Sequence, residues 1–251
     1  MTHMKDPMND AQRYLDIVAS QIRQVRETQW SSIQTAGQWI ADALAGDHWF
    51  YTVGTGHSRM LAEEVFHRAG GLARAIPFLD PMVYFTAGAE AATAFERKEG
   101  AAKELLSQYP VASGDVLLVA SNSGRNALPI EMALHAKELG LKVIALVNLE
   151  HSKAWPTRHS SGGNLAETAD LVLDNCGIEG DAALEIDGVP GRVAPTSTIT
   201  GALLVNLVMV AAVSHMKSNG IDPEIYISSN SNGDDHNTRL ADKYRDRIRH
   251  L

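Results

Sequence analysis

The sequence predicts an α/β fold in which helices cover both faces of a parallel β-sheet. Strand-like and helix-like segments alternate along the chain from residue 48 to residue 217. Two of the strand-like segments, 116–120 and 143–147, are apolar at every position, which is typical of parallel strands buried on both faces. The 251 residues, of which 45% are hydrophobic and 21% charged, suffice for one large domain or two small ones.

The first half of the chain is expected to begin with helix and then to enter the sheet. Apolar residues recur at helical spacing from Tyr14 to Leu44, and Gly46-Asp47 ends that pattern. The aromatic and β-branched segment that follows has the composition of a strand. In chain order we expect a helix over 10–45, a strand over 48–53, a helix over 59–69, a strand over 73–78, a loop with some helix over 82–98 and a helix over 100–109.

The second half continues the alternation and ends in a long apolar helix and a polar tail. The expected elements are strands over 115–120, 141–147 and 169–173, helices over 126–139 and 196–218, loops over 151–164 and 175–195, and a short helix over 239–249. We therefore expect N-terminal helices over 1–45, a main domain over 46–220 and a C-terminal tail with a short helix over 221–251, all within one structural domain.

Charge and cysteine content argue against several classes of function. The formal net charge is −8 and no lysine/arginine run reaches motif length, which argues against nucleic acid as the main partner. The single cysteine, Cys176, cannot form an internal disulfide and fits a reducing compartment. The first ten residues lack the apolar segment of a signal peptide, and the apolar segment 199–213 is too short for a membrane span. The sequence thus predicts a soluble, cytoplasmic protein with no membrane partner.

Two strand-to-helix turns share one design. The segment GTGHS (54–58) follows the first expected strand, and SNSGRN (121–126) follows the third. Glycine lets the backbone turn tightly and approach a ligand, hydroxyls supply donors, and a helix start presents free N–H groups. A third helix start, 195–200, adds four more hydroxyls. Each turn alone could be an ordinary helix cap, but together they are well suited to phosphate. The candidate phosphate ligands are Gly56, Ser58, Ser121, Asn122, Ser123, Gly124, Asn126, Thr196, Ser197 and Thr198.

The familiar nucleotide-binding motifs are absent or incomplete. The GxxxxGK[ST] phosphate loop does not occur, and the dinucleotide fingerprint lacks its third glycine, whose place is held by Arg59. Asp80, near the end of the second expected strand, could imitate the acid that binds a ribose, but the match is weak. We predict no cofactor.

The helix after the first turn carries acid and base groups. Glu63 and Glu64 lie four and three residues before His67, so a carboxylate and an imidazole share a helix face. With His57 at the helix start, these residues could perform general acid–base catalysis beside a phosphate site. The simpler interpretation is a solvated face with a local ion pair. The spacing is not that of the two-histidine zinc motif, so no metal is predicted.

Two further features receive structural interpretations. Cys176 has no identifiable base to activate it and is interpreted as structural. The run 228–237 is too polar to form core and fits a flexible tail, or a loop before a last short helix. His236 within this run is a lone histidine that carries little weight by itself.

Three segments together resemble a known family. GTGHS (54–58), SNSGRN (121–126) and PTSTITG (195–201) resemble the sugar isomerase (SIS) domain of phosphosugar-binding proteins, over about residues 35–220. The resemblance narrows to a subgroup of stand-alone bacterial SIS proteins through TRHSSG (157–162), GDAALEI (180–186) and GDDHN (233–237). It implies a three-layer αβα, flavodoxin-like fold with a five-stranded parallel sheet of order 2-1-3-4-5. A sugar phosphate would lie over the strand ends of a homodimer or homotetramer.

The resemblance also implies roles for residues. By position, the phosphate would be held by Ser121, Ser123 and Asn126, with Ser58 and 196–198 nearby. A heptose-phosphate isomerase branch of the family takes its base from the helix after the first turn. Glu64 lies close to that position, and Glu63 is the alternative.

Three functions remain open on the sequence. An aldose–ketose isomerase would use Glu64 to move a proton between C1 and C2 of a sugar phosphate, with His67 or His57 assisting ring opening. A non-catalytic module would bind the sugar phosphate without turnover. A lyase or etherase would draw a pair of carboxylates from Glu63, Glu64, Glu90, Glu96 and Glu99. If the terminal helices pack across a subunit interface, His236 could complete the partner's site.

Overall fold

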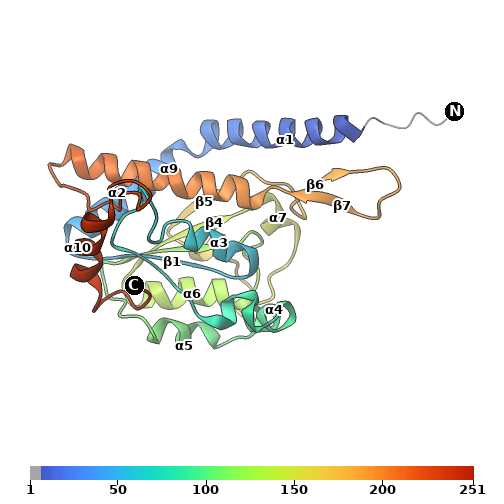
Figure 1. Cartoon of the computed structure of the whole chain (residues 1–251). Coiled ribbons are helices and arrows are strands. Elements are labelled where there is room, and N and C mark those ends of the chain that lie inside the picture. Colours follow the sequence, from blue (N-terminus) through green and yellow to red (C-terminus); the bar gives the residue numbers. More distant parts are fainter. Residues whose placement is uncertain (1–6) are drawn as a thin grey trace.

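The computed structural model describes residues 7–251, and a single parallel sheet forms its centre (Figure 1). The sheet has five strands in the order β2-β1-β3-β4-β5, and all of their pairings are parallel. The strands are β1 (Phe50–Gly54), β2 (Ala75–Pro77), β3 (Val116–Ala120), β4 (Lys142–Val147) and β5 (Leu171–Asp174). The predicted α/β class and the strand order 2-1-3-4-5 are therefore confirmed.

Helices cover both faces of the sheet and complete a three-layer αβα sandwich (Figure 1). One layer contains α2 (Trp30–Ala45) and α9 (Ser197–Ser218), and the other contains α5 (Ala101–Ser107) and α6 (Ala127–Glu138). Successive strand residues point to opposite faces. Val116 and Leu118 of β3 therefore join the core with α2 and α9, whereas Leu117 and Val119 join the core with α5 and α6.

The remaining elements are short or lie at the periphery. The helices are α1 (Pro7–Thr28), α3 (Arg59–Glu63), α4 (Ala89–Arg97), α7 (Leu149–Ala154), α8 (Leu165–Thr168) and α10 (Asp234–Tyr244). Single 3₁₀ turns occur at Gly56–Ser58, Pro81–Val83 and Phe85–Ala87. The segment 82–98, expected to be loop with some helix, thus consists of such turns followed by α4.

The helical region expected over 10–45 consists of two helices, α1 and α2, which meet at Gln29. The side-chain Oε1 of Gln29 accepts a hydrogen bond from the backbone N–H of Asp174, at the end of β5, at 2.9 Å. The chain bends at this point, so α2 lies on the sheet while α1 runs along the outside of α9 (Figure 1). This hydrogen bond at the bend joins residues 145 positions apart, and hydrophobic periodicity cannot reveal such a contact.

The helix expected over 59–69 ends early, because α3 stops at Glu63. The Ala62 carbonyl, which would accept a bond from the next turn of helix, accepts the Thr52 hydroxyl at 2.9 Å instead. The N–H of Phe66 bonds to the carbonyl of Glu63 at 3.0 Å, which tightens the chain. His67 follows with a left-handed backbone (φ +43°). The segment 64–69 is therefore a series of turns.

The long loop expected over 175–195 contains an antiparallel hairpin of β6 (Ala182–Glu185) and β7 (Arg192–Pro195). The hairpin projects from the body of the molecule near the start of α9 (Figure 1). The sequence carried a signal for it, because Asp187-Gly188 is a turn dipeptide between two β-like segments. The loop expected over 151–164 likewise begins inside α7.

The last helix, expected over 239–249, is α10 and starts five residues earlier, at Asp234. The segment GDDHN (233–237) provides its N-cap and first turn. Two aspartates suit a helix start because they face the positive end of the helix dipole. The run interpreted as a flexible tail or loop is therefore partly helical.

By length and composition α9 could cross a membrane, and among the described residues no other helix could. It packs closely against α2, and half of its most apolar window is buried, as is usual for a core helix. The sequence predicted a buried helix, and the structure buries one side of it. Ile199 and Val210 on the other side are 42% and 64% exposed.

The two edges of the sheet carry different segments. At the amino edge, where the strands begin, Ile225 bridges to Leu72 and Tyr244 of α10 packs edge-on against Trp49, with 5.3 Å between ring centroids. At the carboxyl edge, where the strands end, lie the turns 54–58 and 121–126. The tail thus covers the edge opposite to the candidate site.

Candidate functional site

The strand register brings the predicted turns together at the carboxyl edge. Gly54 at the end of β1 pairs with Ala120 at the end of β3, and Ala120 pairs with Leu146 of β4. Because β1 and β3 are neighbours in the sheet, their chains leave in opposite directions at the topological switch point. The turns 54–58 and 121–126 therefore flank the crevice where open α/β sheets bind ligands.

The turn after β3 is stabilised from within. The Ser121 hydroxyl is buried and accepts a hydrogen bond from the Gly124 N–H at 3.2 Å. Gly124 has φ +61°, a conformation that favours glycine. Ser123 lies at the tip of this turn and is partly exposed. No residue in the described range 7–251 hydrogen-bonds its hydroxyl. Ser121 thus shapes the turn, and Ser123 can reach a ligand.

The helix after this turn has no side-chain cap. Asn126 is the N-cap of α6, but its side chain does not bond to the helix N–H groups. Instead its Nδ2 donates to Glu96 Oε1 at 2.8 Å and its Oδ1 accepts from Arg158 at 3.0 Å. The N–H groups of Ala127 and Leu128 at the start of α6 have no side-chain partner and remain suited to an anion, whereas Pro129 at the third position has no N–H.

The start of α9 differs, because a carboxylate already lies there. Asp181 Oδ1 accepts the N–H groups of Thr196 and Ser197 at 3.0 and 2.8 Å, and its Oδ2 accepts the Ser197 hydroxyl at 2.6 Å. The Asp181 carboxylate therefore occupies the place at the start of α9 where the sequence predicts an anionic ligand. Thr196 is buried, whereas Thr198 is partly exposed with its hydroxyl unbonded among residues 7–251.

A small pocket lies where these segments converge. The space between its side chains is about 10 Å³, which is barely enough for one water molecule. His57 at its mouth is exposed and packs edge-on against Phe85, with 5.2 Å between ring centroids. The pocket is lined by His57, Ser58, Leu61, Asn122, Leu146, Asn175, Ser197 and Thr198. The structure thus brings together residues from all three predicted segments.

Of the predicted acid–base residues, His57 lines this pocket, but Glu64 and His67 do not. Glu64 Oε1 accepts a hydrogen bond from Asn206 of α9 at 2.8 Å and forms an ion pair with Arg68. Asn206 lies eight residues beyond Thr198, or about 12 Å along the helix axis. His67 lies farther away still, packed at a tilt against the Tyr226 ring at the amino edge, with 4.5 Å between ring centroids. The crossover from β1 to β2 carries these residues away from His57.

Glu63, the alternative base, belongs to a different cluster. It accepts a hydrogen bond from Arg59 at 2.9 Å, and the Arg59 guanidinium lies over the Tyr84 ring, 4.4 Å from its centroid. Burial and a hydrogen bond to Glu63 raise the pKa of the Tyr84 hydroxyl well above its usual value. Tyr84 therefore remains a protonated donor beside Glu63.

Cys176 and His236 take up structural contacts. Burial raises the pKa of the Cys176 thiol, and its Sγ lies 3.7 Å from the Thr28 hydroxyl. The Nε2 of His236 lies 2.9 Å from the carbonyl oxygen of Ile225, at the amino edge. His236 is therefore remote from the pocket of its own chain. Within residues 7–251, no three His, Cys, Asp or Glu side chains gather as a metal site.

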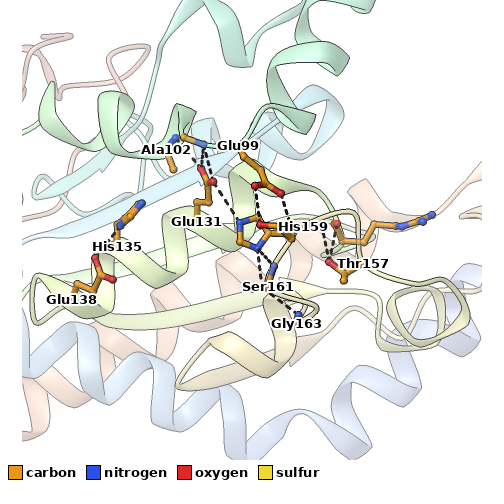
Figure 2. A network of polar contacts seen from close by, with 12 residues as sticks. Glu99, Ala102, Glu131, His135, Glu138, Thr157, His159, Ser161 and Gly163 are labelled. Atoms are coloured by element: carbon orange, nitrogen blue, oxygen red, sulfur yellow. Dashed lines mark hydrogen bonds and ion pairs between the residues drawn. The ribbon is translucent and has the colours of Figure 1, made fainter.

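Sequence reasoning missed a buried carboxylate network beside the second turn (Figure 2). Glu131 of α6 is 7% exposed and accepts the Gly100 N–H at 2.7 and 2.9 Å, at the start of α5. Its Oε1 also lies 3.5 Å from His159 Nε2. His159 Nδ1 in turn lies 2.8 Å from the Ser161 hydroxyl, and Glu99 accepts both the N–H and the hydroxyl of Ser160.

This network anchors the loop 157–163 to α5 and α6. Although Ser161, His159 and Glu131 have the composition of a catalytic triad, the serine bonds to a histidine only two residues away. That short-range contact is typical of a loop closure. The sequence did contain one signal of this network. Glu131 is a lone carboxylate in the otherwise apolar first turns of an expected helix.

Residues 13–148 match the model of the SIS domain family. A UPF0309 protein from Listeria innocua is 38% identical over 94% of this chain and 96% of its own length. A UPF0309 protein from Oceanobacillus iheyensis is also 38% identical, over the full length of both chains. The match is therefore not confined to the region around the predicted turns.

Two solved structures share the fold. A phosphoheptose isomerase from Neisseria gonorrhoeae superposes with a TM-score of 0.55 and 18% identity, over 83% of this chain and 100% of its own. A phosphoheptose isomerase from Francisella tularensis gives a TM-score of 0.54 and 17% identity, over 83% of this chain and 99% of its own. At this level of identity the likeness concerns the fold alone.

Proposed function

Because the chain belongs to the SIS domain family, we propose that it binds a sugar phosphate at the carboxyl edge and isomerises it between aldose and ketose forms. One observation carries the proposal: the turns 54–58 and 121–126 and the start of α9 converge on one pocket at the switch point. Three sources of donors at one place exceed what helix capping requires. The solved neighbours named as phosphoheptose isomerases support the same class of ligand.

The phosphate is proposed to lie at the start of α6. The uncapped N–H groups of this helix and the hydroxyl of Ser123 would be its donors, with Ser58 and Thr198 on the facing side. Asp181 already binds the N–H groups at the start of α9, so we assign that end a shaping role. The pocket has room for about one water molecule, so the sugar would extend outward over exposed His57.

A carboxylate base is proposed to transfer the proton between C1 and C2, and Glu64 is the candidate. Its hydrogen bond to Asn206 places it beside the exposed side of α9 rather than in the pocket of its own chain. Ile199, Asn206 and Val210 recur at intervals of seven and four residues, so they share this exposed helix face.

This exposed face supports association between subunits. The neighbouring α1 adds Leu15 and Ile22, seven residues apart and 60% and 40% exposed. Apolar side chains gathered on one face of two adjacent helices are typical of protein–protein contacts. We propose that the chain forms a homo-oligomer through α1 and α9. Glu64 would then border the interface and could serve a site that two subunits complete.

Binding is tested by thermal shift with matched pairs of sugars, with and without phosphate, and inorganic phosphate as control. A selective rise in melting temperature with a sugar phosphate is expected, because a ligand that binds the native state stabilises it. Ser123→Ala should weaken binding about tenfold by removing a hydrogen bond to a charged group. Ser107→Ala removes a hydroxyl at an exposed position of α5 and should leave binding unchanged. Absence of any selective rise would overturn the proposal that the second turn binds a sugar phosphate.

Catalysis is tested by deuterium exchange into the C1 or C2 position of the sugar phosphate that binds. Glu64→Gln should abolish the exchange while binding persists, because the amide cannot accept the proton. Full exchange in this variant would reject Glu64 as the base.

The same assay separates isomerase from lyase. Glu96 lies against Asn126 at the start of α6, so it is the carboxylate best placed to serve a lyase or etherase at this site. Loss of a substituent from the sugar, sensitive to Glu96→Gln, would favour that second function over isomerisation.

A further inference from the structure

A second polar pocket lies outside the carboxyl-edge site and has a different composition. It encloses about 610 Å³, within the range of small-molecule sites. It is lined by Arg125, His151, Trp155, Arg158, Glu179, Gly180 and Arg192. None of these residues lines the carboxyl-edge pocket. Four segments contribute to it: the second turn, α7 with the chain that follows it, the loop before β6, and β7.

Two of its arginines are held in place by neutral groups. Arg125 Nε donates to the carbonyl of Pro156 at 2.9 Å, and its guanidinium lies over the Trp155 ring, 5.9 Å from the centroid. Arg158 donates to Asn126 Oδ1 at 3.0 Å. Within residues 7–251, neither guanidinium has a carboxylate oxygen within 4.0 Å, whereas Arg192 pairs with Glu185 at 3.2 Å. Neither guanidinium therefore has a carboxylate in direct contact, although the Glu96 carboxylate, on the other side of the Asn126 amide, offsets part of the Arg158 charge.

The lining carries an excess of positive charge on an acidic protein. Three arginines and one glutamate line the pocket, which gives +2 when His151 is neutral, and the Glu185 carboxylate paired with Arg192 lowers this sum to +1, while the whole chain carries −8. Burial and the nearby charges of Arg125 and Arg97 lower the pKa of the Arg158 guanidinium, and the Glu96 carboxylate opposes them only in part. Like charges held together in this way repel one another, and an anion between them would relieve the repulsion.

A histidine donor completes the lining. His151 Nδ1 accepts the N–H of Gly180 at 3.1 Å, so in the neutral ring Nε2 carries the proton. The one acid in the pocket, Glu179, accepts the indole N–H of Trp155 at 3.0 Å. The carboxylate is therefore engaged with a neutral donor and leaves the guanidinium groups available.

We propose that this pocket binds a phosphate dianion, separate from the phosphate bound at the start of α6. A phosphate ester carries a charge of about −1.5 to −2 at pH 7, opposite in sign to the net positive charge of the lining. The planar fork of arginine suits phosphate oxygens in two-point contact. The source is either a second phosphate on the bound sugar or an independent phosphate compound.

The pocket is connected to the second turn through the backbone. The backbone N–H of Arg158 donates to the carbonyl of Arg125 at 2.8 Å. Arg125 itself belongs to the second turn, where it lies between Gly124 and Asn126. An anion that bridges the two guanidinium groups would hold the loop 155–158 against the start of α6. Binding in this pocket would then act on the conformation of the turn that carries Ser123.

The test is calorimetric titration of the full chain with inorganic phosphate, in wild type and variants. Wild type should bind phosphate at two sites. Arg125→Gln and Arg158→Gln should each weaken one of them at least tenfold, and Ser123→Ala should weaken only the other. Arg158→Lys, which keeps the charge but loses the fork, should be intermediate. Arg23→Gln, which removes an exposed charge on α1, is the matched control.

The outcome separates this proposal from the proposed function. If sugar phosphates fail to bind but the arginine-dependent phosphate site persists, only the sugar-phosphate proposal falls. Unchanged phosphate binding in both arginine variants, with unchanged melting temperatures, would overturn the second site. Equal weakening by Arg23→Gln would also overturn it, because the effect would then be one of overall charge.

The two sources are distinguished by competition. If a hexose bisphosphate binds much more tightly than the monophosphate, and Arg158→Gln removes the difference, both phosphates belong to one ligand. If inorganic phosphate still binds at the arginine pocket when sugar monophosphate saturates the protein, the pocket takes an independent compound. Either result supports the pocket as a phosphate site.

Discussion

Asn126 and Asp181 show how single residues decide between a helix cap and a ligand site. Asn126 occupies the N-cap of α6 but turns its side chain to Glu96 and Arg158, so the helix start remains open. Asp181 approaches α9 from a loop and bonds the N–H groups that Thr196 and Ser197 offered to a ligand. In the sequence, both helix starts carry small polar residues and look alike. Residue type alone does not determine which partner a side chain meets, so the sequence does not distinguish the two.

Glu224 illustrates at the same scale how a partly buried charge makes stability depend on pH. Burial alone would raise its pKa, but hydrogen bonds from Lys243 and Tyr244 and the charges of Lys243 and Arg74 hold the pKa below its usual value. A carboxyl group with a lowered native pKa stabilises the fold above its unfolded pKa. That contribution is lost as the pH falls through the native value.

We therefore expect Glu224→Gln to lower the free energy of unfolding by about 1 kcal/mol at pH 7, because charged hydrogen bonds are lost. The difference from wild type should shrink as the pH falls below about 4.5, the usual glutamate value. Urea unfolding at pH 7 and at intervals down to pH 3 measures this. Glu104→Gln, at an exposed position of α5, is the control. A difference that stays constant with pH would contradict the assignment.

Among the elements, the pair α2 and α9 forms the closest helix contact. A Cβ placed on Gly37 of α2 would lie 2.5 Å from Ala211 Cβ and 2.8 Å from the backbone of Ala211 and Ala212. The two helices can approach this closely only because Gly37 has no side chain. The sequence predicted both helices from their periodicity, but it did not predict that they touch.

Gly37→Ala should therefore destabilise the protein, although alanine favours helix. We expect a net loss of about 1–3 kcal/mol, because overpacking outweighs the gain in helix propensity of about 1 kcal/mol. Gln38→Ala, at the next and exposed position of α2, should change stability by less than about 0.5 kcal/mol. Urea unfolding curves of the two variants measure the contrast. A stabilised Gly37→Ala protein would show that the helices separate easily.

For the molecule as a whole, the parallel sheet separates two chemically distinct edges. The carboxyl edge holds the glycine- and serine-rich turns with His57, and the amino edge holds α10 with His67 and His236. His57 and His67 are close in sequence but lie at opposite edges. The crossover from β1 to β2 runs back along the full length of the strands and separates them.

The exposed apolar face of α1 and α9 leads to a prediction at this scale. Val210→Lys should convert the proposed oligomer into smaller species, because a lysine charge cannot be buried unpaired in an apolar interface. Light scattering coupled to gel filtration measures the mass. Leu139→Lys, 48% exposed at the end of α6 in the opposite layer, is the control and should leave the mass unchanged. A wild-type protein that elutes as a monomer would contradict the interface.

The sequence by itself determined the α/β class, the positions of the five sheet strands to within a few residues, and the three polar segments at strand ends and helix starts. These follow from local properties, namely hydrophobic periodicity, turn residues and capping chemistry. The resemblance to the SIS domain added the strand order, which the structure confirmed.

Only the tertiary structure decided which of these residues meet. It placed Glu64 against Asn206, filled the start of α9 with Asp181, and assembled Arg125, Arg158 and Arg192 around one pocket. These contacts join residues that lie from 15 to 142 positions apart in the sequence. Such contacts depend on the way the helices pack on the sheet, and no local sequence pattern encodes that packing.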